Sequence, residues 1–191
     1  MTKPATGIKL TKCKICRTGF KKLSISHKTC SPLCAIALVL AEKEKKSRKA
    51  DRVTRERLKT RQEWLRDAQS AFNKFVRERD KDQPCICCGK LLPETVNGGG
   101  YDCGHYRSVG SAPHLRFDPL NAHGQTKQCN RWGSGRAVDY RLGLIQRIGL
   151  DAVEELEADQ TVKKYSIEEL QVIQKLYREK YKALLSAPVG A

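Results

Sequence analysis

The chain has 191 residues, of which 37 are Lys or Arg and 21 are Asp or Glu, so its formal net charge is +16. The like charges of so basic a protein repel one another. An excess of positive charge usually indicates an acidic binding partner, most often nucleic acid. No apolar run approaches the roughly 20 residues of a membrane helix, and the first thirty residues lack the apolar core of a signal peptide. We therefore expect a cytoplasmic protein with no membrane partner.

The positive charge is concentrated in the N-terminal half. Residues 1–41 carry eight Lys or Arg and no acidic residue, whereas residues 150–191 carry eight acidic residues against six basic ones. The surface that meets a polyanion is therefore expected in the N-terminal half. The C-terminal block is expected to pack against the rest of the chain or to pair with another copy.

The first predicted element is a small zinc finger in residues 1–40. Nine cysteines in a cytoplasmic chain indicate zinc ligands or free thiols more than disulfides. Two thiol pairs separated by thirteen residues suit the tetrahedral preference of zinc, and the stretch is too short to fold on apolar burial alone. The expected ligands are Cys13, Cys16, Cys30 and Cys34. The nearby side chains expected to contact DNA phosphates are Lys12, Lys14, Arg17 and Lys21.

A long helix is predicted next, because residues 35–80 contain neither Pro nor Gly. Its charged part is assigned as a segment of its own, residues 41–82. From Trp64 to Val76, apolar residues recur every three or four positions and form a stripe. Residues 42–61 have almost no such stripe, so that part is expected to face solvent or DNA.

Short strands and further helices follow. Lys90–Pro93 and Tyr101–Tyr106 flank the turn-forming run Asn97–Gly100 and are candidates for a pair of strands. A helix is expected from Arg136 until Gly149 ends it. The expected fold class is therefore α+β, mainly helical.

The C-terminal segment, residues 150–191, is predicted to be helical. A capping box at Ser166–Glu169 starts the last helix, and the apolar face of that helix runs from Leu170 to Leu184. This face and the Trp64–Val76 stripe are candidates either for a homodimer interface or for the core of a single chain.

The segment Cys85–Asn130 resembles the HNH, or ββα-metal, nuclease superfamily. The resemblance rests on the pair Cys85 and Cys88, on His105, and on Asn121, which stands nine residues before Asn130. In such enzymes a hairpin carries a catalytic His, a loop supplies an Asn, and the first turn of a helix supplies a metal ligand. The segment 83–149 is therefore expected to be an HNH-like nuclease core.

The resemblance implies a role for each polar residue. His105 is expected to be the general base, because a neutral imidazole accepts a proton near physiological pH. Asn130 is expected to bind a catalytic Mg²⁺ or Mn²⁺, as the Asn after the last zinc-binding Cys does in phage resolvases of the endonuclease VII type. Asp102 and His123 are candidates for further metal ligands or positioning groups. Asn121 is expected to brace the loop through side-chain hydrogen bonds.

The resemblance also implies a second structural zinc, whose ligand set is irregular. Three expected ligands are Cys85, Cys88 and Cys129. Thr126 stands where the family pattern has a further cysteine, and Cys103, or with lower weight Cys87, is expected to fill that place. If neither does, this zinc is weak or absent, so one or two structural zinc ions are expected per chain. Gly104 stands where many HNH enzymes have a metal-binding Asp or His, which leaves the role of Asp102 open.

Nearly the whole chain resembles the NinG (Rap) family of lambdoid bacteriophages. The segments that carry this resemblance are Asp102–Tyr106, Leu115–Asn121, Gly124–Asn130 and Tyr140–Gly149. It implies a structure-specific endonuclease that cuts branched recombination intermediates, namely Holliday junctions and D-loops, in the cytoplasm of the bacterial host. Because junction resolution needs two symmetric nicks, a homodimer is expected. Without the resemblance, composition and the spacing of the motifs indicate only a basic, zinc-stabilised nuclease.

Two alternative functions remain open at this point. A non-catalytic zinc-finger protein that binds or shapes DNA explains the charge and both cysteine units, but it leaves Asp102, His105 and Asn130 without a role. An RNA-binding protein is a third, weaker interpretation. The arginines near the expected site that are candidates for DNA contacts are Arg107, Arg131, Arg136 and Arg141.

Overall fold

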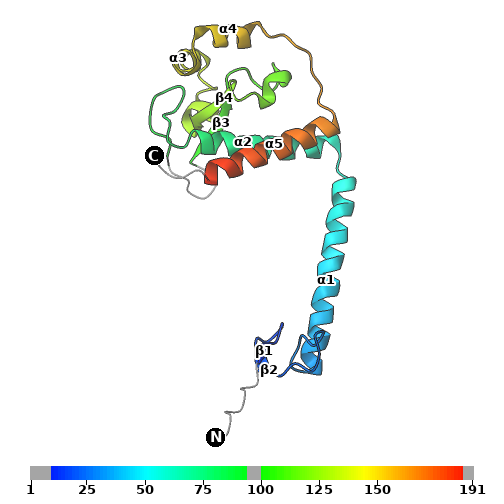
Figure 1. The fold of residues 1–191 in the computed structure, drawn as a ribbon. Coiled ribbons are helices and arrows are strands. Elements are labelled where there is room, and N and C mark those ends of the chain that lie inside the picture. The colour runs from blue at the N-terminus through cyan, green and yellow to red at the C-terminus, as the bar shows by residue number, and fades with distance from the viewer. Residues whose placement is uncertain (1–9, 94–99, 187–191) are drawn as a thin grey trace. The chain divides into compact units, whose positions relative to one another are not determined.

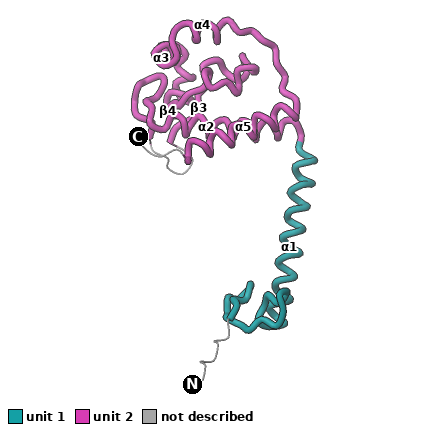
Figure 2. The backbone as a smooth tube through the Cα atoms, viewed as in Figure 1, with its two compact units in different colours: residues 1–59 teal, residues 60–191 magenta. Residues whose placement is uncertain are grey.

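The computed structural model describes residues 10–93 and 100–186 (Figure 1). The chain forms two compact units, residues 1–59 and residues 60–191 (Figure 2). It is mainly helical with two small sheets, so the expected α+β class is confirmed. Residues 97–99 of the predicted turn lie outside the described residues. Among the helices that are described, none is long and apolar enough to cross a membrane.

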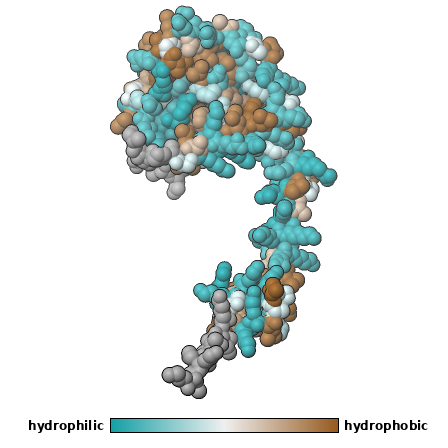
Figure 3. All heavy atoms as spheres, viewed as in Figure 1, coloured by the Kyte–Doolittle hydropathy of each residue, from teal (hydrophilic) through white to brown (hydrophobic). Residues whose placement is uncertain are grey.

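Unit 1 consists of a small hairpin and a long helix. Strands β1 (Thr11–Lys12) and β2 (Gly19–Phe20) pair antiparallel. Helix α1 (Pro32–Arg57) is capped by Ser31, whose hydroxyl accepts a hydrogen bond from the Cys34 amide. No residue of α1 is buried, and its visible side chains are mainly hydrophilic (Figure 3). This agrees with the missing apolar stripe, since a helix without one has no face to bury.

The stretch predicted as one helix, residues 35–80, is two helices. Helix α1 ends at Arg57, and α2 (Arg61–Arg79) begins after a capping box. The Thr60 hydroxyl accepts a hydrogen bond from the Glu63 amide, and the Glu63 carboxylate accepts one from the Thr60 amide. These bonds satisfy backbone amides that a new helix leaves without partners, so they fix its start without any Pro or Gly.

Unit 2 is built on the packing of α2 against α5 (Ile167–Ser186) (Figure 1). The apolar stripe of α2 and the apolar face of α5 enclose one aromatic core, in which Tyr177 contacts Phe72 and Phe75. Burial of each such side chain contributes on the order of 1.5–3 kcal/mol. Both faces therefore contribute to the core of unit 2.

The second sheet is an antiparallel pair, β3 (Tyr101–His105) and β4 (Ala122–Thr126). The expected pairing of β3 with Lys90–Pro93 is wrong. That segment instead forms a bridge to Pro84, and its first residue accepts a hydrogen bond from the Cys85 amide. Its backbone groups are thus used by the turn around the cysteines, which leaves β3 to pair with a more distant strand.

The remaining elements surround this hairpin. A 3₁₀ helix, η1 (Pro113–Phe117), lies between β3 and β4, and a short π-helix, η2 (Gln128–Trp132), follows β4. Helices α3 (Ala137–Ile148) and α4 (Leu150–Ala158) come next. They meet at Gly149, whose φ of 87° ends α3 as expected, because this backbone conformation favours glycine.

Candidate metal centres and a polar pocket beside the hairpin

The first candidate metal centre lies in unit 1. Its four sulfur atoms lie within 4.8 Å of one another and belong to Cys13, Cys16, Cys30 and Cys34. The Cys30 amide donates a hydrogen bond to the Cys13 sulfur, so the two pairs are joined through the backbone as well. His27 is not in the group: its Nδ1 accepts from the Leu23 amide and its ring packs on Phe20. Four thiols at this spacing can hold a tetrahedral zinc ion.

The second candidate metal centre, in unit 2, has three cysteines. The sulfur atoms of Cys85, Cys88 and Cys129 lie within 4.8 Å of one another. The Thr126 hydroxyl lies 3.8 Å from the Cys85 sulfur and accepts a hydrogen bond from the Cys129 amide. Cys103, expected as the fourth ligand, is not in the group. The Cys103 side chain instead packs on the α2–α5 core and lines the polar pocket described below.

Cys87 lies beside the second cluster but is not one of the three grouped sulfurs. Its sulfur accepts a hydrogen bond from the Gln125 amide at 2.8 Å and donates to the Gly135 carbonyl at 3.6 Å. The hydrogen bond with Cys85, together with burial, raises the pKa of Cys87 above its ordinary value. The three grouped sulfurs therefore lie beside Thr126, with Cys87 hydrogen-bonded to Cys85 next to them.

One cysteine in each cluster favours the thiolate, the form that binds metal. Burial raises the pKa of Cys13, but hydrogen bonds from backbone amides, including that of Cys16, outweigh it and bring the pKa to about 6. The pKa of Cys85 is lowered to about 3, first by the hydrogen bond from Cys87 and, against the effect of burial, by the Thr126 amide. Both clusters are therefore suited to a metal such as zinc.

A polar pocket of about 490 Å³ lies between α2, β3 and η2. On the hairpin side it is lined by Asp102, Asn130 and Arg131. The Asp102 carboxylate accepts hydrogen bonds from the Asn130 amide at 3.0 Å and from Arg131 at 2.8 and 2.9 Å. Partial burial raises the pKa of Asp102, but the bonds from Arg131 and Asn130 lower it overall. The ionised Asp102 thus orients Asn130, whose amide oxygen is left for a cation.

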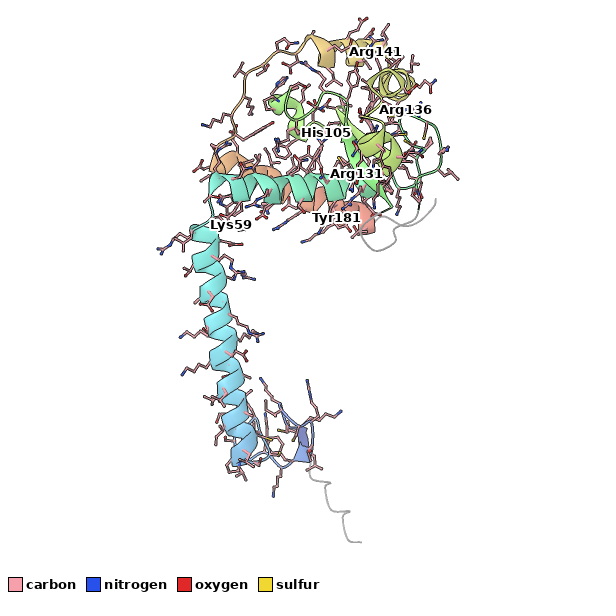
Figure 4. The ribbon with its side chains drawn as sticks, turned by 180° about the vertical axis from the view of Figure 1, so that it is seen from behind. Lys59, His105, Arg131, Arg136, Arg141 and Tyr181 are labelled. Atoms are coloured by element: carbon pink, nitrogen blue, oxygen red, sulfur yellow. The ribbon has the colours of Figure 1, made fainter. Side chains whose placement is uncertain are left out.

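His105 lies on the same strand, three residues beyond Asp102 (Figure 4). Its Nε2 is 3.0 Å from the Arg116 carbonyl, which places the proton on Nε2 and leaves Nδ1 as an acceptor. Burial lowers the pKa of His105, and the hydrogen bond to Arg116 opposes this only in part. His105 is not among the described residues that line the pocket, but Arg116 connects the two, since its side chain donates to Gln69 in the pocket wall.

Asn121 is fully buried and lies in the connection between the two strands, directly before β4. Its amide donates to the carbonyls of Arg107 and Leu115, and its side-chain oxygen accepts from the Arg107 amide. These are the loop-bracing hydrogen bonds expected of it. Asn121 therefore acts on the site through the backbone that it holds.

His123, a candidate metal ligand or positioning group, is not among the described residues that line the pocket. Its Nδ1 lies 3.2 Å from Arg79 and 3.4 Å from Arg147, and its Nε2 lies 3.1 Å from a backbone carbonyl. Asp80 lies 3.7 Å away and completes a buried ionic cluster. The physical reason is that Arg79, Arg147 and a backbone carbonyl engage both ring nitrogens and hold the ring in that cluster.

Gly104 is required by close packing within the hairpin. A Cβ atom at this position would lie 2.0 Å from the Gln125 side-chain oxygen. The space beside Gly104 is therefore occupied by Gln125. Asp102, two residues earlier on β3, supplies the carboxylate of the pocket instead.

The four arginines of unit 2 that are expected to hold DNA all have partners within the protein. Arg107 donates to backbone carbonyls at the end of α4, and these hydrogen bonds hold its side chain against the fold. Arg131, Arg136 and Arg141 each pair with a carboxylate, yet their side chains remain 58%, 45% and 37% exposed (Figure 4). In unit 1 the four expected contacts are all exposed: Lys12, Lys14, Arg17 and Lys21.

Helix α2 supplies most of the pocket wall, although the sequence motifs predict no site residue in this helix. Its lining residues include Arg66, Gln69, Asn73 and Arg77. The signal for them was present in the sequence, because these positions recur at three- and four-residue spacing beside the apolar stripe. The apolar stripe is the stronger pattern, and it identifies only the side of the helix that faces the core.

Three comparisons place the chain among known proteins. A family model described as the Bacteriophage Lambda NinG protein matches residues 5–186. The chain is 37% identical to protein ninG of Escherichia phage 933W, with 96% of each chain covered, and 37% identical to that of Salmonella phage P22, with 88% of this chain and 90% of the relative covered. No solved structure matches it.

The relative in phage lambda is 36% identical, with 96% of each chain covered. The sequence resemblance predicts the phage lambda member itself, and that prediction is wrong. At 36% identity the two are distinct chains, although the motifs that carry the resemblance led to the right family.

Proposed function

The chain belongs to the NinG family of bacteriophage proteins, and from this premise we propose that it is a metal-dependent endonuclease that cuts branched DNA. The observation that carries the proposal is the polar pocket, where Asp102 orients Asn130 beside a hairpin that holds a neutral His105. In this proposal β3, β4 and η2 form the HNH-like core. The substrates are recombination intermediates such as Holliday junctions and D-loops in the host cytoplasm.

In this proposal the pocket takes a hard divalent cation, Mg²⁺ or Mn²⁺, together with the substrate phosphate. Such ions prefer oxygen ligands, and Mg²⁺ is commonly bound through one or two carboxylates plus substrate phosphates while it keeps several waters. Asn130 would hold the ion through its amide oxygen, while Asp102 acts from behind as a positioning residue. When bound, the cation supplies charge neutralisation at the phosphate and at the leaving oxygen. Arg131 would exchange part of its contact with Asp102 for the phosphate.

His105 would be the general base. Its Nδ1 accepts a proton from water as the water oxygen attacks the phosphorus and the bond to the 3′ oxygen breaks. The hydrogen bond from Nε2 to the Arg116 carbonyl keeps the imidazole in the tautomer that this step needs. The lowered pKa keeps the ring neutral at physiological pH.

The two cysteine clusters would be structural zinc sites, and unit 1 would grip DNA through its exposed basic side chains. A homodimer would place two nicks symmetrically. Since the apolar faces of α2 and α5 are used in the core, the dimer would need another surface.

The deciding experiment is cleavage of a four-way DNA junction with Mg²⁺ by the wild type and by His105→Ala. We expect the substitution to lower the rate about 10²- to 10⁴-fold, because it removes the base, while junction binding is kept. His27→Ala is the matched control, since His27 lies in unit 1 and outside the cysteine group. Unchanged cleavage by His105→Ala would overturn the assignment of the base.

The same assay separates the alternatives. Tight junction binding without cleavage under any divalent metal would support a non-catalytic zinc-finger protein that binds or shapes DNA. Competition between RNA and junction DNA at matched salt tests the RNA-binding alternative, because electrostatic affinity depends strongly on salt. Preference for RNA would favour that alternative over a DNA nuclease.

A further inference from the structure

Resting on the proposed nuclease function, we infer that one side of α2 is a phosphate-binding subsite for the DNA strand beside the scissile phosphate. This side, named the α2 polar face, consists of Arg66, Gln69, Ser70, Asn73 and Arg77. All five residues line the same pocket as Asp102 and Asn130. None of the five belongs to the metal-binding or base assignments made above.

The helical repeat puts these residues on one side of α2. Positions three, four, seven and eleven residues apart lie along one face of a helix. The neighbouring face buries Phe72 and Val76 in the α2–α5 core, which holds the helix in place. The Tyr101 hydroxyl donates a hydrogen bond to the Arg77 carbonyl and so ties this turn of α2 to β3. The polar face is therefore a rigid wall of the pocket.

The net positive charge of the pocket favours binding of an anion. Three arginines line it, Arg66, Arg77 and Arg131, against a single carboxylate, that of Asp102. Arg131 already pairs with Asp102. Within the part of the chain that the structure describes, neither Arg66 nor Arg77 forms an ion pair. Two cationic forks without a carboxylate, facing a concave surface, match the geometry of phosphate oxygens.

The neutral side chains of the face are ordered to add donors. Gln69 donates to the Asn73 side-chain oxygen at 2.8 Å, and the Gln69 oxygen accepts from Arg116 at 3.4 Å. With its oxygen occupied, Asn73 has amide hydrogens left to donate to a phosphate oxygen. The contact with Arg116 also places this part of the face next to the carbonyl that orients His105.

The pocket has room for more than a hydrated metal ion. A Mg²⁺ ion with six waters takes about 200 Å³, since a water takes about 30 Å³. The pocket has about 490 Å³. Because five of its lining residues come from α2, a phosphate in the pocket can lie against the α2 polar face. Such a contact would set the path of the cleaved strand.

The test measures junction binding in a His105→Ala background, with Mg²⁺ present and cleavage blocked. Fluorescence anisotropy gives Kd for Arg66→Gln and Arg77→Gln over a range of salt concentrations. We expect each variant to bind about tenfold more weakly and to reduce the slope of log Kd against log salt by about one, as the loss of one phosphate contact does. Lys74→Gln is the matched control: it removes the same charge from an exposed position of α2 outside the pocket, and should change neither value.

Unchanged slopes in both arginine variants would overturn the inference. Inorganic phosphate, added at constant ionic strength, identifies the source of the anion. If the variants lose only their response to inorganic phosphate and bind the junction like the parent protein, the pocket is a free-anion site and the inference is also overturned. Thermal unfolding of each variant, unchanged from its parent, shows that the fold is intact.

The two proposals can fail separately. If the wild type never cuts a junction, the nuclease function fails, and the binding slopes still decide whether the α2 polar face holds a phosphate. If the wild type cuts and His105→Ala does not, but the slopes are unchanged, only the subsite fails. In the cleaving enzyme, Arg77→Gln is expected to raise KM about tenfold with little change in kcat, because it removes binding away from the reacting atoms.

Discussion

The two cysteine clusters hold their surroundings together by different means. In unit 1 four sulfurs organise a hairpin and the start of a helix, and of the described residues there only Cys13 and Thr29 are buried. In unit 2 three sulfurs lie on a small core that also buries Leu92 and Tyr101. We therefore expect the first cluster to need a bound metal for folding, whereas the second has packing to stabilise it. A cluster with its own packing can have Thr126 in place of a fourth cysteine.

Metal removal is the largest expected effect of this difference. A zinc-selective chelator should unfold residues 11–31, because bound zinc supplies on the order of 10–16 kcal/mol in isolated zinc fingers. The hairpin of unit 2 should stay folded, since it has a core of its own. Two-dimensional amide NMR separates the two regions within one sample. Dispersed signals for residues 11–31 in metal-free protein would contradict the comparison.

The packing of the second cluster is tested by Leu92→Ala. This substitution should lower the free energy of unfolding of unit 2 by about 2–5 kcal/mol, because it leaves a cavity beside Cys85 and Cys129. Leu91→Ala is the matched control, since Leu91 is 83% exposed against 7% for Leu92, and it should cost less than about 0.5 kcal/mol. Urea denaturation measures both. Equal effects would mean that packing does not stabilise this cluster.

The missing cysteine is tested by Thr126→Cys. The Thr126 hydroxyl lies 3.8 Å from the Cys85 sulfur, so a thiol there can complete a four-cysteine set. The zinc affinity of the second cluster should rise at least about tenfold, or about 1.4 kcal/mol. Competition with a chromogenic chelator measures it, and Thr161→Cys, an exposed position, serves as control. An unchanged affinity would show that another group already takes the fourth position.

The smallest effect concerns pH and the hairpin beside the second cluster. The pKa of His105 is lowered, mainly by burial, so the neutral base persists below the ordinary histidine value of about 6.5. Junction cleavage should stay constant as pH falls from 8 to about 6.5, then drop about tenfold for each further unit below the lowered pKa. Initial rates between pH 5 and 8 give the midpoint. A midpoint above 6.5 would show that the fold does not keep His105 neutral.

Features that depend on near neighbours in the chain were predictable. The pairs at Cys13 and Cys30, the capping box at Ser166 and the helix end at Gly149 all appear where their spacing places them. Each involves contacts between residues a few positions apart, so the chain needs no distant partner to form them. The capping box that starts α2 at Thr60 is also a local pattern. It lies within a long charged run, so the sequence predicts one continuous helix there.

Features that depend on facing and pairing were not predictable. On a strand, one position decides which side of the sheet a side chain meets, and this placed Cys103 on the α2–α5 core. His123 joins the buried ionic cluster because its partners Arg79 and Asp80 come from the end of α2, far away in the chain. Likewise, the sequence pattern does not reveal that β3 pairs with the segment around Gly124 and not with the nearer Lys90–Pro93. Such choices follow from the packing of the whole unit.

The sequence by itself therefore determined the mainly helical α+β class, the NinG family and the cysteine groups, because composition, motifs and short spacings are properties of the chain alone. Only the tertiary structure decided that Asp102 orients Asn130, that Thr126 stands beside three cysteines, and that Arg66 and Arg77 share a pocket with Asp102 and Asn130. The physical reason is that these arrangements join residues from α2, β3, β4 and η2, which lie far apart in the chain. They meet only when burial of the aromatic core sets how the helix and hairpin face each other.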